Sequence, residues 1–561
     1  MVDSAILVRA SNQLGEVQAD WMPASGIRPL VFDDPVLTWL EFHGREHGFT
    51  PDSSPYEFLD FIAARGRQFE DRWIAENVTS PTRVCINDHE VRTSATLDAT
   101  IRLMDQGVPV IVHPALWWAP ERIYGVPDLI VRSDWLVEKF PTMAIEGGPE
   151  YVIVDLKFTT ELDSKEKTKD LLNYGSQVRL YSAMLGHLQG RMPHAAFIFT
   201  RDRLTDPIAV AVQTPIDGPL DTDLAGLREF YLHIKQNGAD MLPWLDATMA
   251  PNLSNGSDDP WHSAKIKIAT ERTAGRDPSL VYYISGKTKQ TLATAGFPNL
   301  QAILEKDPTS IPLESCKGLG EKRSAQIRAI FQANKTGVAV RPERSLIPQR
   351  RECEFFVDFE YFTNVNVKFD SQWPRLEGCE IVFMVGVGWE ADGKWSFRSF
   401  AADAEDPLAE RRMFDDAAEF LHETSKGRLG DCDQTALYHW TSAEVWQLKR
   451  VCERHGLPAD SPLRGLPWVD LNKLFLDGPC AIPGALDFAL KHVARALGEH
   501  SPAHNVAWPG DLDSGLRAMV MGWRAYEHPK PLESPEMATL QQYLEADCRA
   551  LWAILSWLRA G

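Results

Sequence analysis

One group of charged residues, Asp128, Asp155 and Lys157, has the types and spacing needed to act on a phosphate group. Asp155 and Lys157 stand two positions apart in an apolar run at 151–158, so both side chains should leave the same face of a strand. Asp128 lies near the start of a second expected strand at 126–132. Two carboxylates beside a lysine can hold a divalent cation, and the lysine can orient a water or offset charge on a phosphate. Magnesium suits such a site, because it binds a few carboxylates and otherwise keeps water and substrate oxygens.

A helix expected at 169–188 follows these residues and carries Gln177 and Tyr181 on one face, four positions apart. Glu70 lies on an earlier expected helix, in the stretch Gly-Arg-Gln-Phe-Glu. Over about residues 55–205 this arrangement resembles the PD-(D/E)XK nuclease superfamily, in its RecB-like branch with a Gln-x-x-x-Tyr helix. The resemblance implies a restriction-endonuclease-like α/β core, with Gln177 and Tyr181 in contact with the substrate.

The resemblance also implies a role for each charged residue of this group. Asp128 and Asp155 would bind metal, with Glu70 as a further ligand, and Lys157 would assist hydrolysis. The residues alone leave two simpler readings open. Asp-x-Lys can be a surface ion pair at a strand end, and Glu70 can pair with the arginine three positions before it or two positions after it.

Some relatives in this branch carry an iron–sulfur cluster on cysteines that flank the nuclease core. No cysteine occurs here between Cys85 and Cys316, so four sulfur ligands are not available at that spacing. We therefore expect Mg²⁺ or Mn²⁺ as the cofactor and no iron–sulfur cluster.

A basic stretch with two glycines lies in the middle of the chain. Residues 317–351 carry nine Lys or Arg against two Glu, and the segment 316–327 reads Cys-Lys-Gly-Leu-Gly-Glu-Lys-Arg-Ser-Ala-Gln-Ile. The segment resembles a helix-hairpin-helix, in which glycines permit a tight turn and backbone amides at a helix start hold a DNA phosphate. The alternative is an ordinary helix–turn–helix with glycine caps. The expected nucleic-acid contacts are Gly318, Gly320, Lys322 and Arg323.

A second acidic group lies in the C-terminal third of the chain. Asp358 and Glu360 are two positions apart on a strand expected at 354–360, so both side chains should leave one face. Tyr543 and Asp547 are one turn apart on an expected helix. The strand pair could face solvent at a sheet edge, but the flanking Phe and Val residues favour burial, and buried acids need a metal or partners. Two metals about 4 Å apart need several carboxylates from distant elements.

This second group resembles the RNase-H-like, DnaQ-type exonucleases with Asp-Glu-Asp-Asp ligands. The spacing Tyr-x-x-x-Asp corresponds to the tyrosine subgroup. The resemblance implies that Asp358, Glu360 and Asp547 bind metal and that Tyr543 helps to position the attacking water. No lysine is built into this motif, so we expect the metals to supply most of the charge neutralisation.

The third carboxylate departs from the pattern of the resembled family. The nearest stretch, at 439–444, reads His-Trp-Thr-Ser-Ala-Glu, so Glu444 would replace an aspartate and be one methylene longer. Asp470 follows another expected strand and could be a ligand or a structural group.

Composition limits the class of protein. A chain of 561 residues is too long for one core, and 44% hydrophobic with 24% charged residues is ordinary for a soluble globular protein. A net charge of −20 argues against a general nucleic-acid coat protein, but not against a nuclease, because binding depends on the local field. The first residues lack a signal-peptide layout, no apolar run could span a bilayer, and the eight cysteines are scattered. A cytoplasmic protein without membrane association is expected.

Linkers expected at 250–260 and 342–351 divide the chain. The sequence therefore predicts a multidomain α/β protein, and its C-terminal part should fold alone because it has its own strands, helices and apolar residues. The expected domains are a RecB-like PD-(D/E)XK nuclease domain at 1–250 with an N-terminal extension at 1–55, a small all-α helix-hairpin-helix region at 261–341, and an RNase-H-like, 3′–5′ exonuclease-type domain at 350–561.

The combined hypothesis is a metal-dependent DNase, an exonuclease that hydrolyses phosphodiester bonds on single strands or at ends, with RNA as a second substrate class. The alternative is a nucleic-acid-binding adaptor with one working nuclease site and a degenerate RNase-H-like docking module. Magnesium-dependent digestion separates the two. No Gly-x-x-x-x-Gly-Lys-Ser/Thr phosphate loop is present, so unwinding would need a partner, either a helicase or another repair or defence protein.

Overall fold

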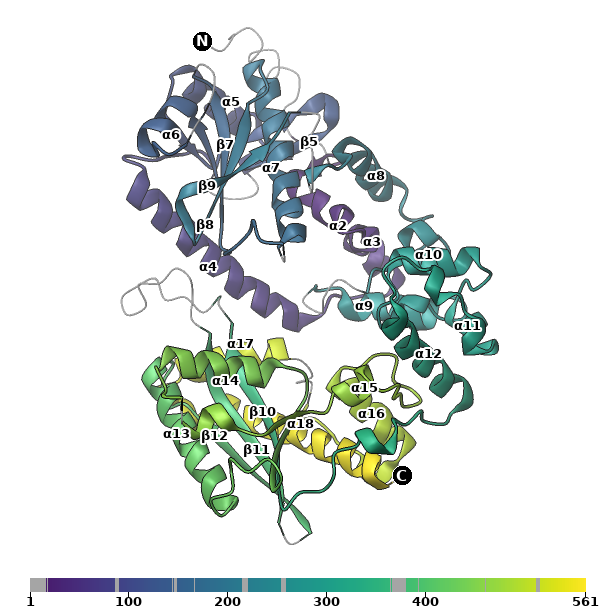
Figure 1. Ribbon diagram of the computed structural model, residues 1–561. Helices are drawn as coiled ribbons and strands as arrows, with labels where there is room; N and C mark the ends of the chain where they lie inside the picture. The colour runs from purple at the N-terminus through teal and green to yellow at the C-terminus, as the bar shows by residue number, and fades with distance from the viewer. Residues whose placement is uncertain are drawn as a thin grey trace.

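The structure is a computed structural model, and it describes residues 17–560 apart from 18, 86–89, 144, 146–148, 166, 214–219, 254–258, 364, 366–379, 392, 460 and 511–514. The expectation about a leader at the first residues lies outside this part of the chain. Figure 1 shows two α/β parts, one formed by the N-terminal and one by the C-terminal half, with a group of short helices beside them. The expectation of a mixed α/β chain is confirmed.

The N-terminal sheet has six strands in the order β2-β3-β6-β7-β8-β9. β6 and β7 are antiparallel, and β8 lies parallel to β7 after the crossover helix α7 (Thr168–Gln189). Most residues of β6, β7 and β8 are buried, which fits strands covered on both faces. The strands are β2 (Thr82–Arg83), β3 (Val110–Val112), β6 (Leu129–Arg132), β7 (Tyr151–Lys157), β8 (Ala195–Thr200) and β9 (Arg203–Ala211).

Alternate residues of β7 face opposite layers of helices. Val154 packs in a hydrophobic cluster with residues of α4 (Ser53–Asn77), whereas Ile153 packs in the cluster that contains residues of α7. Asp155 and Lys157 are an even number of positions from Ile153, so the pleat directs both toward the α7 face.

The segment that precedes α4 is part of the N-terminal core. Trp21 and Trp39 are buried in the same cluster as α7. Strand β1 (Met22–Pro23) pairs with β5 (Ile123–Gly125), which also pairs with β4 (Leu116–Trp118) in a separate three-stranded sheet. The described part of the expected N-terminal extension therefore packs as part of this unit.

Helix α9 (His262–Lys267) follows the linker expected at 250–260 but packs against the N-terminal core. Lys265 is fully buried, and its Nζ lies 2.9 Å from Oδ2 of Asp34 and 2.6 Å from Oδ2 of Asp259. A buried ammonium group needs such partners, because burial removes its hydration. The N-terminal cluster extends to Ile268, beyond the boundary expected near residue 250.

The C-terminal sheet has five strands in the order β12-β11-β10-β13-β14, with β10 in the centre. Phe355, Val357 and Phe359 of β10 pack in the cluster that holds α13 (Pro407–Thr424) and α14 (Ala443–Arg454). The residues between them face the other side, where α18 (Pro535–Ala560) lies. The strands are β10 (Cys353–Phe362), β11 (Ile381–Ala391), β12 (Lys394–Ala401), β13 (Thr435–His439) and β14 (Trp468–Asp470).

Short helices connect the two α/β parts, and they share a hydrophobic cluster with the C-terminal part. Ile330 and Phe331 of α12 (Glu321–Thr336), the last of these helices, are buried in one cluster with Phe475 and Ile482. Three short helices cannot bury enough apolar surface by themselves, so they pack on the neighbouring domain. The domain expected at 350–561 therefore shares part of its hydrophobic core with the short helices. The helices are α10 (Gly286–Thr294), α11 (Leu300–Glu305) and α12 (Glu321–Thr336).

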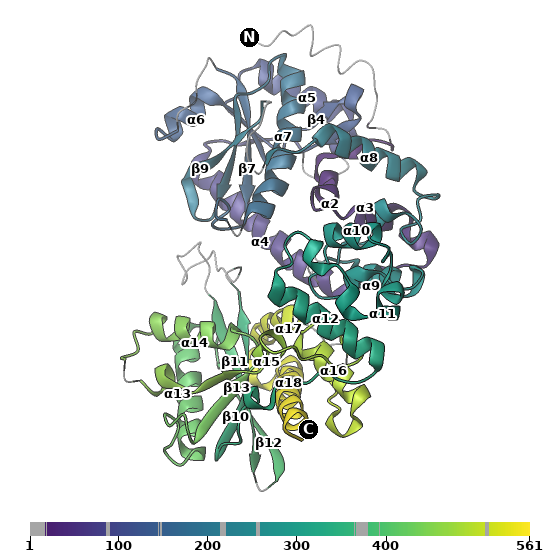
Figure 2. The same cartoon turned by 45° about the vertical axis from the view of Figure 1, so that its right-hand side comes forward.

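Helix α4 lies between the two α/β parts in both views (Figures 1 and 2). The rings of Phe61 and Trp523 stack with centroids 3.6 Å apart and planes 13° apart. Trp523 lies on α17 (Gly515–Glu527) and also stacks on Phe362 at the end of β10, with centroids 5.6 Å apart. An aromatic stack thus joins the helix that carries Glu70 to the strand that carries the C-terminal acids.

Candidate metal and nucleic-acid sites

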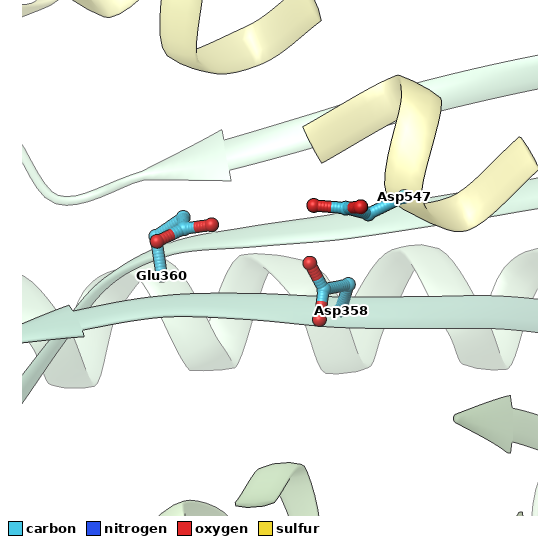
Figure 3. A group of neighbouring side chains, drawn as sticks. All are labelled: Asp358, Glu360 and Asp547. Carbon is cyan, nitrogen blue, oxygen red and sulfur yellow. The ribbon is translucent and has the colours of Figure 1, made fainter. Parts of the chain in front are cut away.

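The structure brings together three acids of the C-terminal part. Asp358, Glu360 and Asp547 each offer a carboxylate oxygen, and these oxygens all lie within 4.8 Å of one another (Figure 3). Asp358 and Glu360 leave the face of β10 that lies under α18, and Asp547 comes from α18 itself. Among the residues that the structure describes, this is the one group of three or more acidic, histidine or cysteine side chains with ligand atoms so close together.

Gly386 allows α18 to approach the sheet closely enough for this convergence. It pairs with Asp358 in the β10–β11 ladder. A Cβ atom at Gly386 would lie 2.6 Å from Cγ of Leu544 and 3.2 Å from Sγ of Cys548, both on α18. A side chain at this position would therefore push away the helix that carries Asp547.

Burial raises the pKa of each of these acids, and repulsion from neighbouring carboxylates adds to the shift for Asp358 and Glu360. Burial is the main cause for Asp358, and the charges of Asp547 and Glu444 add to it. Burial and then the Asp358 charge raise the pKa of Glu360, and burial raises that of Asp547. Like charges in a water-poor site disfavour ionisation unless a cation is present. The donor set of three carboxylates therefore fits one or two hard divalent cations.

Glu444 lies beside this group rather than within it. It hydrogen-bonds with Asp358, and burial raises its pKa to about 8. Nδ1 of His439 lies 3.2 Å from Oε2 of Glu444. Asp470 accepts hydrogen bonds through Oδ1 from the backbone N–H groups of Thr441, at 3.1 Å, and Asn472, at 2.9 Å. These contacts give Asp470 a structural role in holding the loops after β13 and β14.

Two residues that the sequence analysis did not identify complete the surroundings of Asp547. Nε1 of Trp508 donates to Oδ1 of Asp547 at 2.9 Å. Nζ of Lys491 donates to the hydroxyl of Tyr543 and lies 4.1 Å from the centre of its ring. The motif itself holds no lysine, but α16 (Leu490–His500) supplies one positive charge, which opposes the raised pKa values of the three acids without cancelling them. No local pattern distinguishes Lys491 from other lysines on amphipathic helices.

In the N-terminal site, a lysine lies between the two expected carboxylate ligands. Nζ of Lys157 lies 2.6 Å from Oδ2 of Asp155 and 4.0 Å from Oδ2 of Asp128. The same Asp128 oxygen accepts a hydrogen bond from the backbone N–H of Leu156 at 2.6 Å. Burial raises the pKa of Asp155 to about 7, although Lys157 opposes the shift. Burial alone would lower the pKa of Lys157, but the two carboxylates raise it above its usual range.

Gln177 and Tyr181 bond to each other next to this site. Nε2 of Gln177 donates to the hydroxyl of Tyr181 at 2.9 Å. The Tyr181 ring packs on Gly125, where an added Cβ would lie 2.5 Å from Cε1 of the ring. Burial and the nearby Asp155 charge raise the pKa of Tyr181. The glycine two residues before the Pro-Asp pair thus makes room for the tyrosine of the following helix.

Glu70 forms an ion pair with a histidine, not with either neighbouring arginine suggested by the sequence. Oε1 of Glu70 contacts Nε2 of His113, while Arg72 pairs with Glu76. Burial opposes protonation of His113, but the bond to Glu70 raises its pKa overall. The backbone N–H of His113 donates to the carbonyl of Asp128 at 2.9 Å. His113 therefore adjoins the predicted metal ligands, and no motif in the sequence indicated it.

The glycine loop before α12 is exposed. Gly318 has a φ of +93°, which favours glycine, and no atom lies within 4 Å of a Cβ built at Gly318 or Gly320. Nζ of Lys322 pairs with Oδ1 of Asp477 at 2.5 Å. Arg323 donates to the carbonyl of Gly318 at 3.1 Å and lies 4.0 Å above the ring of Tyr283. The loop is open to a ligand, and its two cations are already oriented by the protein.

Comparison with known proteins identifies one family. Residues 376–559 match the family model of the RNase_H superfamily, whereas a search of curated proteins gives no match. The matched range contains Glu444, Tyr543 and Asp547 and begins after β10. No helix of the described residues is long and apolar enough to cross a membrane. The C-terminal part is therefore RNase-H-like, which indicates a nucleic-acid-hydrolysing enzyme.

Proposed function

We propose that this protein is a divalent-metal-dependent DNA exonuclease that acts on single strands or at ends. The observation that carries the proposal is the convergence of Asp358, Glu360 and Asp547. Asp547 lies within the range that matches the RNase_H superfamily, and the other two acids lie on the strand before it. An adaptor with a degenerate docking module would have no need to keep three carboxylates together, two of them buried, because each costs stability without a cation.

The residues present support hydrolysis of a phosphodiester. Asp358, Glu360 and Asp547 would hold Mg²⁺ or Mn²⁺, which supplies Lewis acidity and neutralises the phosphate charge when bound. The Tyr543 hydroxyl is fixed between Lys491 and Asp547, so it can hold a water beside the acids. The Lys491 ammonium adds positive charge at the edge of the site, where a phosphate would enter.

A second nuclease activity at the N-terminal site is part of the proposal. A strand pair that brings Asp128 and Asp155 to Lys157, next to a Gln-x-x-x-Tyr helix, supports a RecB-like PD-(D/E)XK assignment. The exposed glycine loop before α12 supports the helix-hairpin-helix assignment, with backbone amides near Gly318 and Gly320 holding a phosphate.

Digestion of end-labelled DNA by the full chain tests the proposal. Single- and double-stranded substrates labelled at either end are incubated with Mg²⁺, Mn²⁺ or a chelator. We expect metal-dependent release of short products, abolished by chelation and strongly reduced by Asp547→Asn. Glu536→Gln, a half-buried acid in the first turn of the same helix and far from the acidic group in sequence, serves as the matched control. Cleavage that is absent for the wild-type protein under all conditions would reject the nuclease and leave the adaptor alternative.

A further inference from the structure

A cavity of about 520 Å³ lies where the N-terminal unit, the short helices and α16 meet. Its apolar wall includes Leu280, Val281 and Leu486, and its polar lining includes the side chains described below. This size and mixture are typical of a pocket for a small organic group such as a nucleotide. Figures 1 and 2 both place α9, α10 and α16 on the same side of the molecule.

The side chains of two arginines and one histidine nitrogen of this cavity form no ion pair or hydrogen bond with the residues that the structure describes. Arg276 and Arg495 form no ion pair with any residue that the structure describes, and both are exposed. Nδ1 of His262 is buried and lacks a hydrogen-bond partner within the same described residues. Glu499 also lines the wall, and Asp487 is held by His492 at 2.7 Å. Two arginines without carboxylate partners favour an anionic ligand.

An exposed aromatic ring lies at the rim of the cavity nearest the glycine loop. The Tyr283 side chain is 48% exposed, although large aromatic residues are usually buried. Its backbone has a φ of +61°, a conformation that a non-glycine residue rarely adopts. Arg323, from the first turn of α12, lies over the ring and donates to its hydroxyl at 3.3 Å. The ring is therefore held in place by the helix-hairpin-helix segment.

The part of the lining that comes from α16 adjoins the C-terminal acids. Arg495 lies one turn after Lys491 on α16, so the two side chains share a helix face. The Arg495 guanidinium is 5.8 Å from the centre of the Trp508 ring. Trp508 in turn donates to Asp547. A single indole thus separates the cavity lining from the acidic group.

We propose that this cavity binds one nucleotide of a single DNA strand that runs from the glycine loop to the C-terminal acids. The inference rests on the proposed nuclease function and extends it to the path of the substrate. The base stacks on Tyr283, and Arg276 and Arg495 contact the backbone phosphates on either side. Stacking on an aromatic ring within a cationic groove binds single strands without sequence preference. The helix-hairpin-helix segment and the C-terminal site then act on the same strand.

Fluorescence anisotropy tests this path without cleavage. It measures the binding of a fluorescein-labelled oligothymidylate to the full chain in the presence of a chelator. Tyr283→Ala should weaken binding about tenfold, the usual scale for loss of one stacked base, whereas Tyr283→Phe keeps the ring and should bind like the wild type. Arg495→Gln should weaken binding and reduce the slope of log affinity against log salt by about 0.7. Trp446→Ala is the matched control, because Trp446 is 55% exposed, lies beside Lys449 and does not line the cavity.

The outcomes separate the two proposals. Equal affinities for Tyr283→Ala, Arg495→Gln and Trp446→Ala would overturn the cavity as a binding site. Metal-dependent cleavage that is lost in Asp547→Asn would in that case still support the nuclease. A wild-type protein that neither binds the oligonucleotide nor cleaves DNA would overturn both. Thermal unfolding of each variant checks its fold, and Arg495→Gln, a change at an exposed position, keeps the test decisive if Tyr283→Ala is unstable.

Discussion

The N-terminal and C-terminal acidic groups differ in how the protein neutralises them. In the N-terminal group, Lys157 comes from the same strand as Asp155 and lies 2.6 Å from it. In the C-terminal group three carboxylates converge, and the lysine brought near them contacts Tyr543 rather than an acid. A carboxylate already paired with an ammonium group attracts a metal less strongly than an unpaired one. The C-terminal group therefore depends more heavily on bound cations than the N-terminal group does.

The two groups also differ in how far apart their residues are in the chain. Asp128, Asp155 and Lys157 lie on or directly before the paired strands β6 and β7, so local strand geometry places them. Asp547 reaches Asp358 only because α18 packs across β10 and β11 at Gly386. A change in how distant helices pack should therefore separate the residues of the C-terminal group but leave those of the N-terminal group together.

The largest expected effect comes from removing each group in turn. Asp547→Asn should reduce release of short products by at least about 10²-fold, the scale of losing one electrostatic group. Asp155→Ala or Lys157→Ala should remove the cleavage that remains in Asp547→Asn. The measurement is product length on gels with end-labelled DNA.

Circular dichroism checks whether each of these variants is folded. If the folded double variant Asp155→Ala, Asp547→Asn cleaves DNA at the wild-type rate, neither acidic group is catalytic.

Without metal, the free energy of unfolding should fall as the pH rises, because the acids of the C-terminal group resist ionisation. The pKa of Glu444 is raised from 4.5 to about 8, so its protonated form contributes stability at low pH. That contribution is lost as the pH rises from about 4.5 to about 8, by a few kcal/mol. Urea unfolding in chelator should show this decline, and Mn²⁺ should reverse it at high pH.

Asp358→Asn should flatten this decline, because the pKa of Asp358 is itself raised by burial and its ionisation would no longer contribute. Asp155→Asn should remove a separate part of the decline, between about pH 4 and pH 7, because the pKa of Asp155 is raised to about 7 even beside Lys157. A stability that rises with pH in chelator, or that ignores Mn²⁺, would contradict the view that the C-terminal group depends on cations.

A smaller effect is expected from the lysine at the edge of the C-terminal site. Lys491→Met should slow cleavage at this site about tenfold, less than the loss of a general acid or base, because Lys491 acts through the Tyr543 hydroxyl. Because Lys491 acts by holding the Tyr543 hydroxyl, Lys491→Met and Tyr543→Phe should be non-additive in a double-mutant cycle. Additive losses would show that Lys491 acts independently of Tyr543. Mn²⁺ affinity should not fall in Lys491→Met.

The smallest effect concerns the glycine loop between the two groups. Gly318→Ala forces a side chain onto a φ of +93° and should weaken DNA binding, with the salt slope reduced by about one if a phosphate contact is lost. Gly320 has a φ of −74° and open space around it, so Gly320→Ala should weaken binding less. Anisotropy titrations at several salt concentrations measure both. Identical behaviour of the two variants and the wild type would exclude this loop as a phosphate site.

Alternation and helix spacing were sufficient to predict which residues share a face. Asp358 and Glu360, two apart on a strand, and Asp547, one turn after Tyr543, could be chosen in this way, as could Asp155 and Lys157. The mixed α/β class followed from the same patterns.

Contacts between distant elements could not be predicted in this way. Lys491 meets Tyr543 across 52 positions, and His113 meets Glu70 across 43. Apolar periodicity on α12 shows that Ile330 is buried but does not identify Phe475 as a member of the same cluster. A single sequence indicates which residues share one face of a helix or strand. Which distant residue each of them contacts depends on how the whole chain packs.

The hydrophobic cluster shared by the short helices and the C-terminal sheet limits where this gene could be cut and joined. A junction at 342–351 would separate α12 from its buried partners and leave apolar surface on both products. A junction between Ile268 and Val281 would pass between two clusters and leave each largely intact. The unit that recombination could transfer to another protein therefore begins before α10, and carries the glycine loop together with the C-terminal acids.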